Sequence, residues 1–92
     1  MISLKHDDIK KHLLQDPEVK SEYEKLQVLY NIKREIIRLR LEQGLSQKDL
    51  ADKVGTKQSA ISRLESGEYN PSVEFLTKIA HALGKELEIK FY

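Results

Sequence analysis

Residues 47–67 read QKDLADKVGTKQSAISRLESG, and their pattern indicates the class of fold. Apolar side chains recur at helical spacing on either side of Gly55, which indicates two short helices joined by a tight glycine turn. Ala51 supplies the small side chain that two closely crossing helices need where they touch. The expected apolar anchors to the rest of the domain are Leu50, Val54, Ile61 and Leu64. An ordinary helical hairpin would also use a glycine turn, but the combination favours a helix-turn-helix.

Cap residues delimit the neighbouring helices. Ser46, with Asp49 three residues later, predicts a capped start for the helix over residues 47–54. Gly67 closes the helix that follows Gly55 and begins near residue 57. Ser72 can cap a last helix that ends at Gly84. The apolar face of that helix is expected to comprise Val73, Leu76, Ile79, Ala80 and Leu83.

The region before the motif also has a helical pattern. Asp7 can cap a short helix that runs to about Gln15, and Asp16-Pro17-Glu18 predicts a second helix start. Two apolar stripes follow, the first made of Val19, Tyr23, Leu26 and Tyr30 and the second of Ile32, Ile36, Ile37 and Leu39. The pattern leaves open whether residues 17–43 form one helix or two.

The last residues change period. Apolar and charged side chains alternate from Glu86 to Phe91, which predicts a strand. Because a lone strand is unstable in water and residues 1–4 are only a weak strand candidate, we expect this tail to pair with a second chain. The residues expected to mediate that dimerisation are Leu87, Ile89 and Phe91.

Composition narrows the functional class without deciding it. The chain has 92 residues, 16 basic and 15 acidic, for a formal net charge of +1, so bulk charge does not by itself indicate a nucleic-acid partner. No cysteine is present, which fits a reducing compartment. With no signal-peptide core and no apolar run long enough for a bilayer, we expect a cytoplasmic, nucleoid-associated protein.

Neither catalysis nor a cofactor is expected. His6, His12 and His81 lack ligand-like spacing to one another or to carboxylates, so no metal site is predicted. No nucleophile–base pair and no glycine-rich phosphate loop stand out, and the chain is not expected to be an enzyme.

The stretch from Gln47 to Gly67, followed by Asn70-Pro71-Ser72, resembles the Cro/lambda-repressor (XRE) helix-turn-helix family across residues 31–84. The resemblance implies an all-α, lambda-repressor-like domain over residues 28–84. A helical extension over residues 1–27 would precede it, and a short C-terminal β-strand over residues 85–92 would follow. It also implies sequence-specific binding to a palindromic DNA operator as a homodimer.

The same resemblance places the second helix of the motif in the major groove of DNA. The side chains that would face the duplex are Lys57, Gln58, Ser59, Ser62 and Arg63. Gln58 can pair with adenine, Arg63 with guanine or phosphate, and the two serines with bases or phosphates. Gln47 and the loop around Asn70 are further phosphate candidates. Each of these positions could instead be an ordinary solvated polar residue.

Arg40 and Glu65 stand where the family carries an arginine–glutamate pair that links the first helix to the recognition helix. The resemblance therefore implies an architectural role for this pair and no direct contact with DNA.

A narrower resemblance involves both ends of the chain. Residues 16–24, DPEVKSEYE, the helix-turn-helix and the tail GKELEIKF at residues 84–91 together resemble HigA-type antitoxins. That family implies neutralisation of a RelE/HigB-type mRNA-cleaving toxin by direct binding, together with repression of the protein's own operon. The toxin-binding residues would be Val19, Tyr23, Leu26 and Tyr30. Alternatively, this arm only completes the core.

Two rival functions remain open from the sequence. One is a stand-alone phage-type or plasmid-type transcriptional repressor without a toxin partner. The other is a protein-interaction module that keeps the fold but does not bind DNA.

Overall fold

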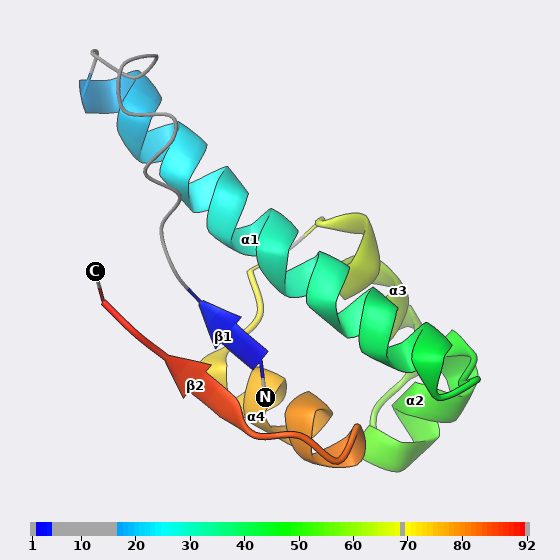
Figure 1. Cartoon of the computed structure of the whole chain (residues 1–92). Helices are drawn as coiled ribbons and strands as arrows, with labels where there is room; N and C mark the ends of the chain where they lie inside the picture. Colours follow the sequence, from blue (N-terminus) through cyan, green and yellow to red (C-terminus); the bar gives the residue numbers. More distant parts are fainter. Residues whose placement is uncertain (1, 5–16, 69, 92) are drawn as a thin grey trace.

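The computed structural model describes residues 2–4, 17–68 and 70–91. The elements are β1 (Ile2–Leu4), α1 (Pro17–Glu42), α2 (Gln47–Val54), α3 (Gln58–Ser66), α4 (Val73–Ala82) and β2 (Leu87–Ile89) (Figure 1). The predicted helix between Asp7 and Gln15, and the predicted cap Asp16, lie outside the described residues. The mainly helical architecture confirms the expected fold class.

Helix α1 is a single helix of 26 residues, which settles the question of one helix or two. Pro17 occupies its first position, where the missing N–H costs no hydrogen bond. The C-terminal half of α1 buries Ile32, Ile36 and Leu39 in the core. Its N-terminal half extends beyond the other helices (Figure 1), so it forms a projecting arm.

The four helices share one core. Each contributes one of the largest fully buried side chains, and these are Ile36, Leu50, Ile61 and Ile79. On α4, Leu76, Ala80 and the following Leu83 are buried as predicted. Val73 is 57% exposed, so its predicted core position is wrong. It is the first residue of α4, where the chain arrives from the surface loop.

The predicted caps of α2 and α4 are confirmed. Ser46 Oγ accepts a hydrogen bond from the N–H of Asp49 at 2.9 Å, and the Asp49 carboxylate accepts one from the N–H of Ser46, also at 2.9 Å. This reciprocal arrangement satisfies two otherwise unpaired donors at the start of α2. Ser72 Oγ accepts from the N–H of Phe75 at 3.0 Å at the start of α4.

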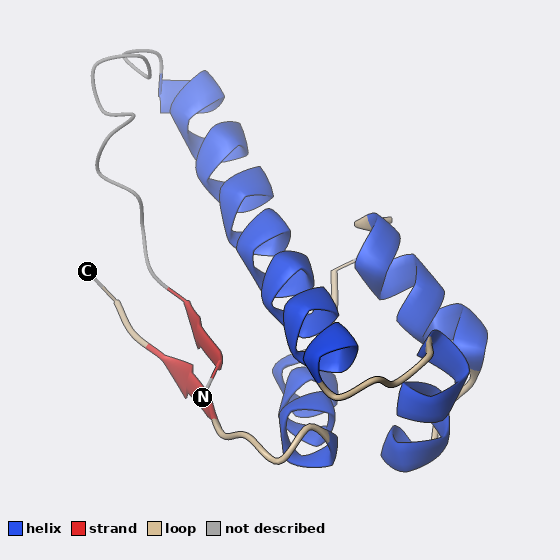
Figure 2. Ribbon diagram, turned by 45° about the vertical axis from the view of Figure 1, so that its right-hand side comes forward, coloured by secondary structure: helices blue, strands red, loops and turns tan. Residues whose placement is uncertain are grey.

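The C-terminal strand finds its partner within the chain. β2 pairs in parallel with β1, with Ile2 opposite Leu87 and Leu4 opposite Ile89. The expectation that the tail needs a second chain for strand pairing is therefore wrong. A three-residue strand at the N-terminus is too short to show the alternation by which strands are recognised. The sheet lies on one side of α1, and α2 and α3 lie on the other (Figure 2).

No helix within residues 17–68 and 70–91 combines the length and the apolar character that a bilayer span requires.

Candidate nucleic-acid interface

The turn between α2 and α3 has the geometry that the motif requires. Gly55 has a φ of 83°, in the left-handed region that glycine adopts without strain. The N–H groups of Gly55 and Thr56 both donate to the carbonyl of Ala51 at 2.9 Å. Ala51 itself is only 1% exposed, so α2 and α3 meet at a small residue as predicted.

Helix α3 has two chemically distinct faces. Ile61, Leu64 and Glu65 are buried against the domain. The outward positions are all exposed, and they are Lys57, Gln58, Ser59, Ser62 and Arg63. Lys57 is not the first helical residue but the N-cap, and its side chain makes no capping hydrogen bond. The polar side chains expected to face DNA therefore form one continuous exposed strip along α3.

A buried ion pair holds α3 against α1. Arg40 Nε lies 2.7 Å from Glu65 Oε2, and Arg40 Nη2 lies 2.9 Å from Glu65 Oε1. The remaining guanidinium nitrogen, Nη1, donates to the carbonyl of Leu45 at 2.8 Å. The two side chains are 12% and 6% exposed. This bidentate geometry fixes the orientation of the recognition helix relative to α1 and the loop before α2.

Gln47 adds a hydrogen bond to the Arg40–Glu65 pair, and the sequence did not predict this bond. Its Nε2 donates to Glu65 Oε1 at 3.1 Å, so the amide nitrogen expected to hold a phosphate points inward in this structure. No sequence signal could have revealed this bond, because Gln47 and Glu65 lie on different helices, 18 residues apart. Asn70 is exposed in the loop after α3.

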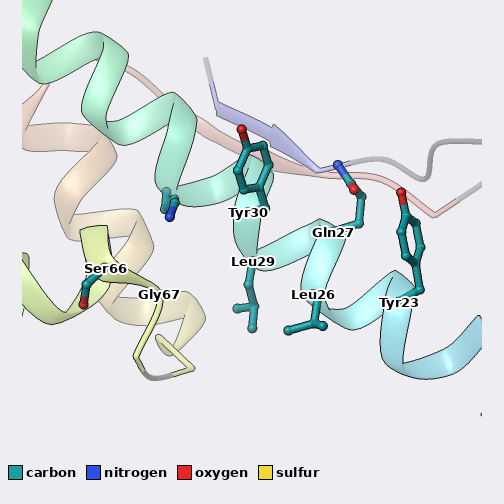
Figure 3. Close-up of a pocket in the computed structure, with 8 residues that line it drawn as sticks. Tyr23, Leu26, Gln27, Leu29, Tyr30, Ser66 and Gly67 are labelled. Carbon is teal, nitrogen blue, oxygen red and sulfur yellow. The ribbon is translucent and has the colours of Figure 1, made fainter. Parts of the chain in front are cut away.

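The expected partner-binding side chains do not lie in the core. Val19, Leu26 and Tyr30 are 54%, 57% and 49% exposed, and Tyr23 is half-buried. They lie on the projecting half of α1, where a groove of about 410 Å³ separates this helix from the end of α3 (Figure 3). Most of these side chains thus remain available on the surface of the chain.

The residues expected to mediate dimerisation differ in exposure. Leu87 packs against the core. Ile89 is 39% exposed and Phe91 is 95% exposed. The exposure of the tail's apolar side chains thus increases from Leu87 to Phe91.

Comparisons with known proteins agree with this geometry. Residues 36–90 match the family described as Helix-turn-helix. An uncharacterized HTH-type transcriptional regulator of Haemophilus influenzae is 45% identical over 56 residues, which is 61% of this chain and 57% of that protein. Multiprotein-bridging factor 1 of Candida glabrata is 40% identical over 60 residues, which is 65% of this chain and 40% of that protein. The chain thus covers about half of these relatives' lengths.

A solved structure is similar over nearly the whole chain. It is described as a toxin-antitoxin module from Streptococcus pneumoniae, with a TM-score of 0.65 and 28% sequence identity. The similarity covers 95% of this chain and 93% of that one, so it includes the projecting arm as well as the helix-turn-helix. Because the family match spans more than half of the residues and the turn has the required geometry, the chain belongs to the helix-turn-helix family, of the Cro/repressor (XRE) type.

Proposed function

We propose that this protein is a DNA-binding antitoxin. It represses its own operon through α3 and neutralises a RelE/HigB-type mRNA-cleaving toxin through the projecting half of α1. The observation that carries the DNA-binding part is the exposed polar strip of α3, held in place from behind by the Arg40–Glu65 pair.

The chemistry of the strip suits a duplex. Gln58 is the first residue of α3, and its amide can donate to and accept from an adenine edge in the major groove. Arg63, five residues later on α3, can reach guanine or a phosphate, and Ser59 and Ser62 are short hydroxyl partners. Lys57, Asn70 and the N–H groups at the start of α2 beside Gln47 are proposed phosphate contacts.

We further propose that the protein binds a palindromic operator as a homodimer. A single recognition helix reads few base pairs, and dimers in this motif class read two half-sites. The sheet has only β1 and β2, so one edge of β2 pairs with no strand of the described chain. Pairing of two β2 edges across a two-fold axis would also cover Ile89 and the exposed Phe91.

The toxin-binding part rests on two observations. The apolar side chains of the arm are exposed, which costs solvation free energy unless a partner covers them. The similar structure from Streptococcus pneumoniae is described as a toxin-antitoxin module and matches the arm as well as the domain. A stand-alone repressor is the second candidate, because the Haemophilus relative is described only as a transcriptional regulator.

Separate variants test the DNA-binding part and the toxin-binding part of this proposal. Gln58→Ala and Arg63→Ala should each weaken binding to the gene's own upstream DNA by about 1–3 kcal/mol, with the helical circular dichroism unchanged. Lys78→Ala, at an exposed position on α4, is the control and should leave that affinity unaltered. Unchanged binding in both α3 variants would refute the placement of the interface.

The arm is tested with a separate double variant. Val19→Ser combined with Leu26→Ser should abolish rescue from the toxin encoded beside this gene, while operator affinity persists. Absence of a toxin gene beside this one, together with normal operator binding, would favour the stand-alone repressor.

A further inference from the structure

The groove between the arm and the recognition helix has two unlike walls. One wall is α1, from which Leu26 and Leu29 point toward the end of α3, while Tyr30 lies on the side of β1 (Figure 3). The other wall is Ser66 and Gly67, where α3 ends. The groove is open, mainly apolar and, at about 410 Å³, large enough for several side chains.

One cation lines this groove. Lys33 is half-buried, and its Nζ lies 5.6 Å from the centroid of the Tyr30 ring. Lys33 forms no ion pair with any side chain of residues 17–68 and 70–91. A partly desolvated ammonium against an aromatic ring gains more from a carboxylate than an exposed lysine does, because less water screens the pair.

We infer that the groove receives an apolar segment of the partner protein that carries an aspartate or glutamate, and that this carboxylate pairs with Lys33. The apolar walls take the flanking side chains, and Lys33 sets their register. A macromolecular occupant fits better than a small ligand, because the exposed apolar side chain of Val19 lies beyond the groove on α1, four residues before the lining residue Tyr23. This inference rests on the proposed toxin-binding function and adds Lys33, Leu29 and the end of α3 to the contact surface.

The test uses the full-length chain co-expressed and co-purified with the product of the adjacent gene, with affinities measured by titration calorimetry. Lys33→Glu should weaken the complex at least about tenfold, because it places like charges together and leaves the apolar walls intact. Lys33→Met keeps most of the stem, so it should weaken binding less. The matched control is Lys20→Glu, an equal charge reversal at an exposed position of the same helix that does not line the groove.

A charge exchange then identifies the carboxylate. Replacing the partner's aspartate or glutamate by lysine should restore binding to the Lys33→Glu protein and to no other variant. Operator affinity of every variant should match that of the unaltered protein, which shows that the domain is folded.

The outcomes separate two kinds of failure. If the unaltered chain forms no complex with the adjacent product, the proposed antitoxin function is wrong and the inference falls with it. If the complex forms and Lys33→Glu binds as tightly as the unaltered chain, the antitoxin function stands and the groove inference is overturned. If Lys33→Glu changes the dimerisation of this protein and leaves partner binding unchanged, a second copy of the chain occupies the groove. That result also overturns the groove inference.

Discussion

Glu65 is the residue on which the interface depends most. Among the described residues, Glu65 is the one charged residue that is buried. Its carboxylate accepts hydrogen bonds from Arg40 and from Gln47. A buried carboxylate is tolerated only when its lone pairs are satisfied, because its desolvation is costly. The same three side chains join α1, α2 and α3, so satisfying one charge also sets the angle of the recognition helix.

Removing one partner of this pair should therefore be costly. Arg40→Met is expected to lower the free energy of unfolding by about 3–5 kcal/mol, because it leaves Glu65 buried and uncompensated. The combined Arg40→Met and Glu65→Leu protein should regain much of that loss. Urea denaturation of the three proteins measures both effects, and equal stability of the single and double variants would contradict this account.

Asp49 is expected to make stability depend on pH. Hydrogen bonds from the backbone N–H and the side chain of Ser46 hold the pKa of Asp49 below its ordinary value of 3.8. A carboxyl with a lowered folded-state pKa stabilises the fold above the ordinary value. That stabilisation disappears as the pH falls through the lowered value.

Asp49→Asn should accordingly reduce the free energy of unfolding at neutral pH, and its difference from the unaltered protein should shrink in strong acid. Denaturation curves recorded at pH 7 and in steps below the ordinary value of 3.8 test this. Asp52→Asn is a control for the loss of one charge, because it breaks only an exposed ion pair with Lys48, and such pairs contribute little. A difference for Asp49→Asn that persisted unchanged into acid would rule out the carboxylate as its cause.

At the scale of elements, the two short helices depend on the turn that joins them. α2 has 8 residues and α3 has 9, too few to be stable as isolated helices. They persist because Leu50 and Ile61 are fully buried in a shared core and because Gly55 adopts the left-handed conformation that ends α2 and begins the turn to α3.

Substitution of Gly55 tests the role of its backbone conformation alone. A Cβ at this position would meet nothing within 4 Å, so any cost of Gly55→Ala arises from the left-handed φ and not from crowding. We expect a loss of about 1–2 kcal/mol for alanine and a smaller loss for asparagine, which enters this region more readily. Thermal unfolding of both variants provides the measurement, and equal losses would indicate that something other than φ is limiting.

For the molecule as a whole, the short sheet joins the two ends of the chain. β1 precedes the arm and β2 follows α4, yet the two strands pair in parallel beside α1 (Figure 1). The helix-turn-helix lies on the opposite side of α1, so sheet and recognition helix are structurally separate (Figure 2).

Deletion of residues 1–4 should loosen the tail without disturbing the motif. The amides of Leu87–Ile89 are expected to exchange faster with deuterium, because β2 loses its ladder partner. Amides of α2 and α3 should keep their protection. Unchanged exchange at Leu87–Ile89 would mean that another strand, such as that of a second copy, already holds β2.

The helix-turn-helix and the caps around it can be predicted from local sequence order alone. Ser46, Asp49, Gly55 and Ser72 act on backbone groups within a few residues of themselves, so their effect is readable from local order. The outward polar face of α3 follows from the same local periodicity. The Arg40–Glu65 contact was foreseeable only through the family resemblance, because no local rule links residues 25 positions apart.

The remaining features became visible in the three-dimensional structure. It showed that residues 17–42 form one helix whose first half leaves the core, that Gln47 points inward to Glu65, and that the tail pairs with the first residues of the chain. It also brought Lys33 to a groove shared with the end of α3. Each of these features depends on which distant side chains remain to be covered once the helices have packed, and local propensity carries no such information.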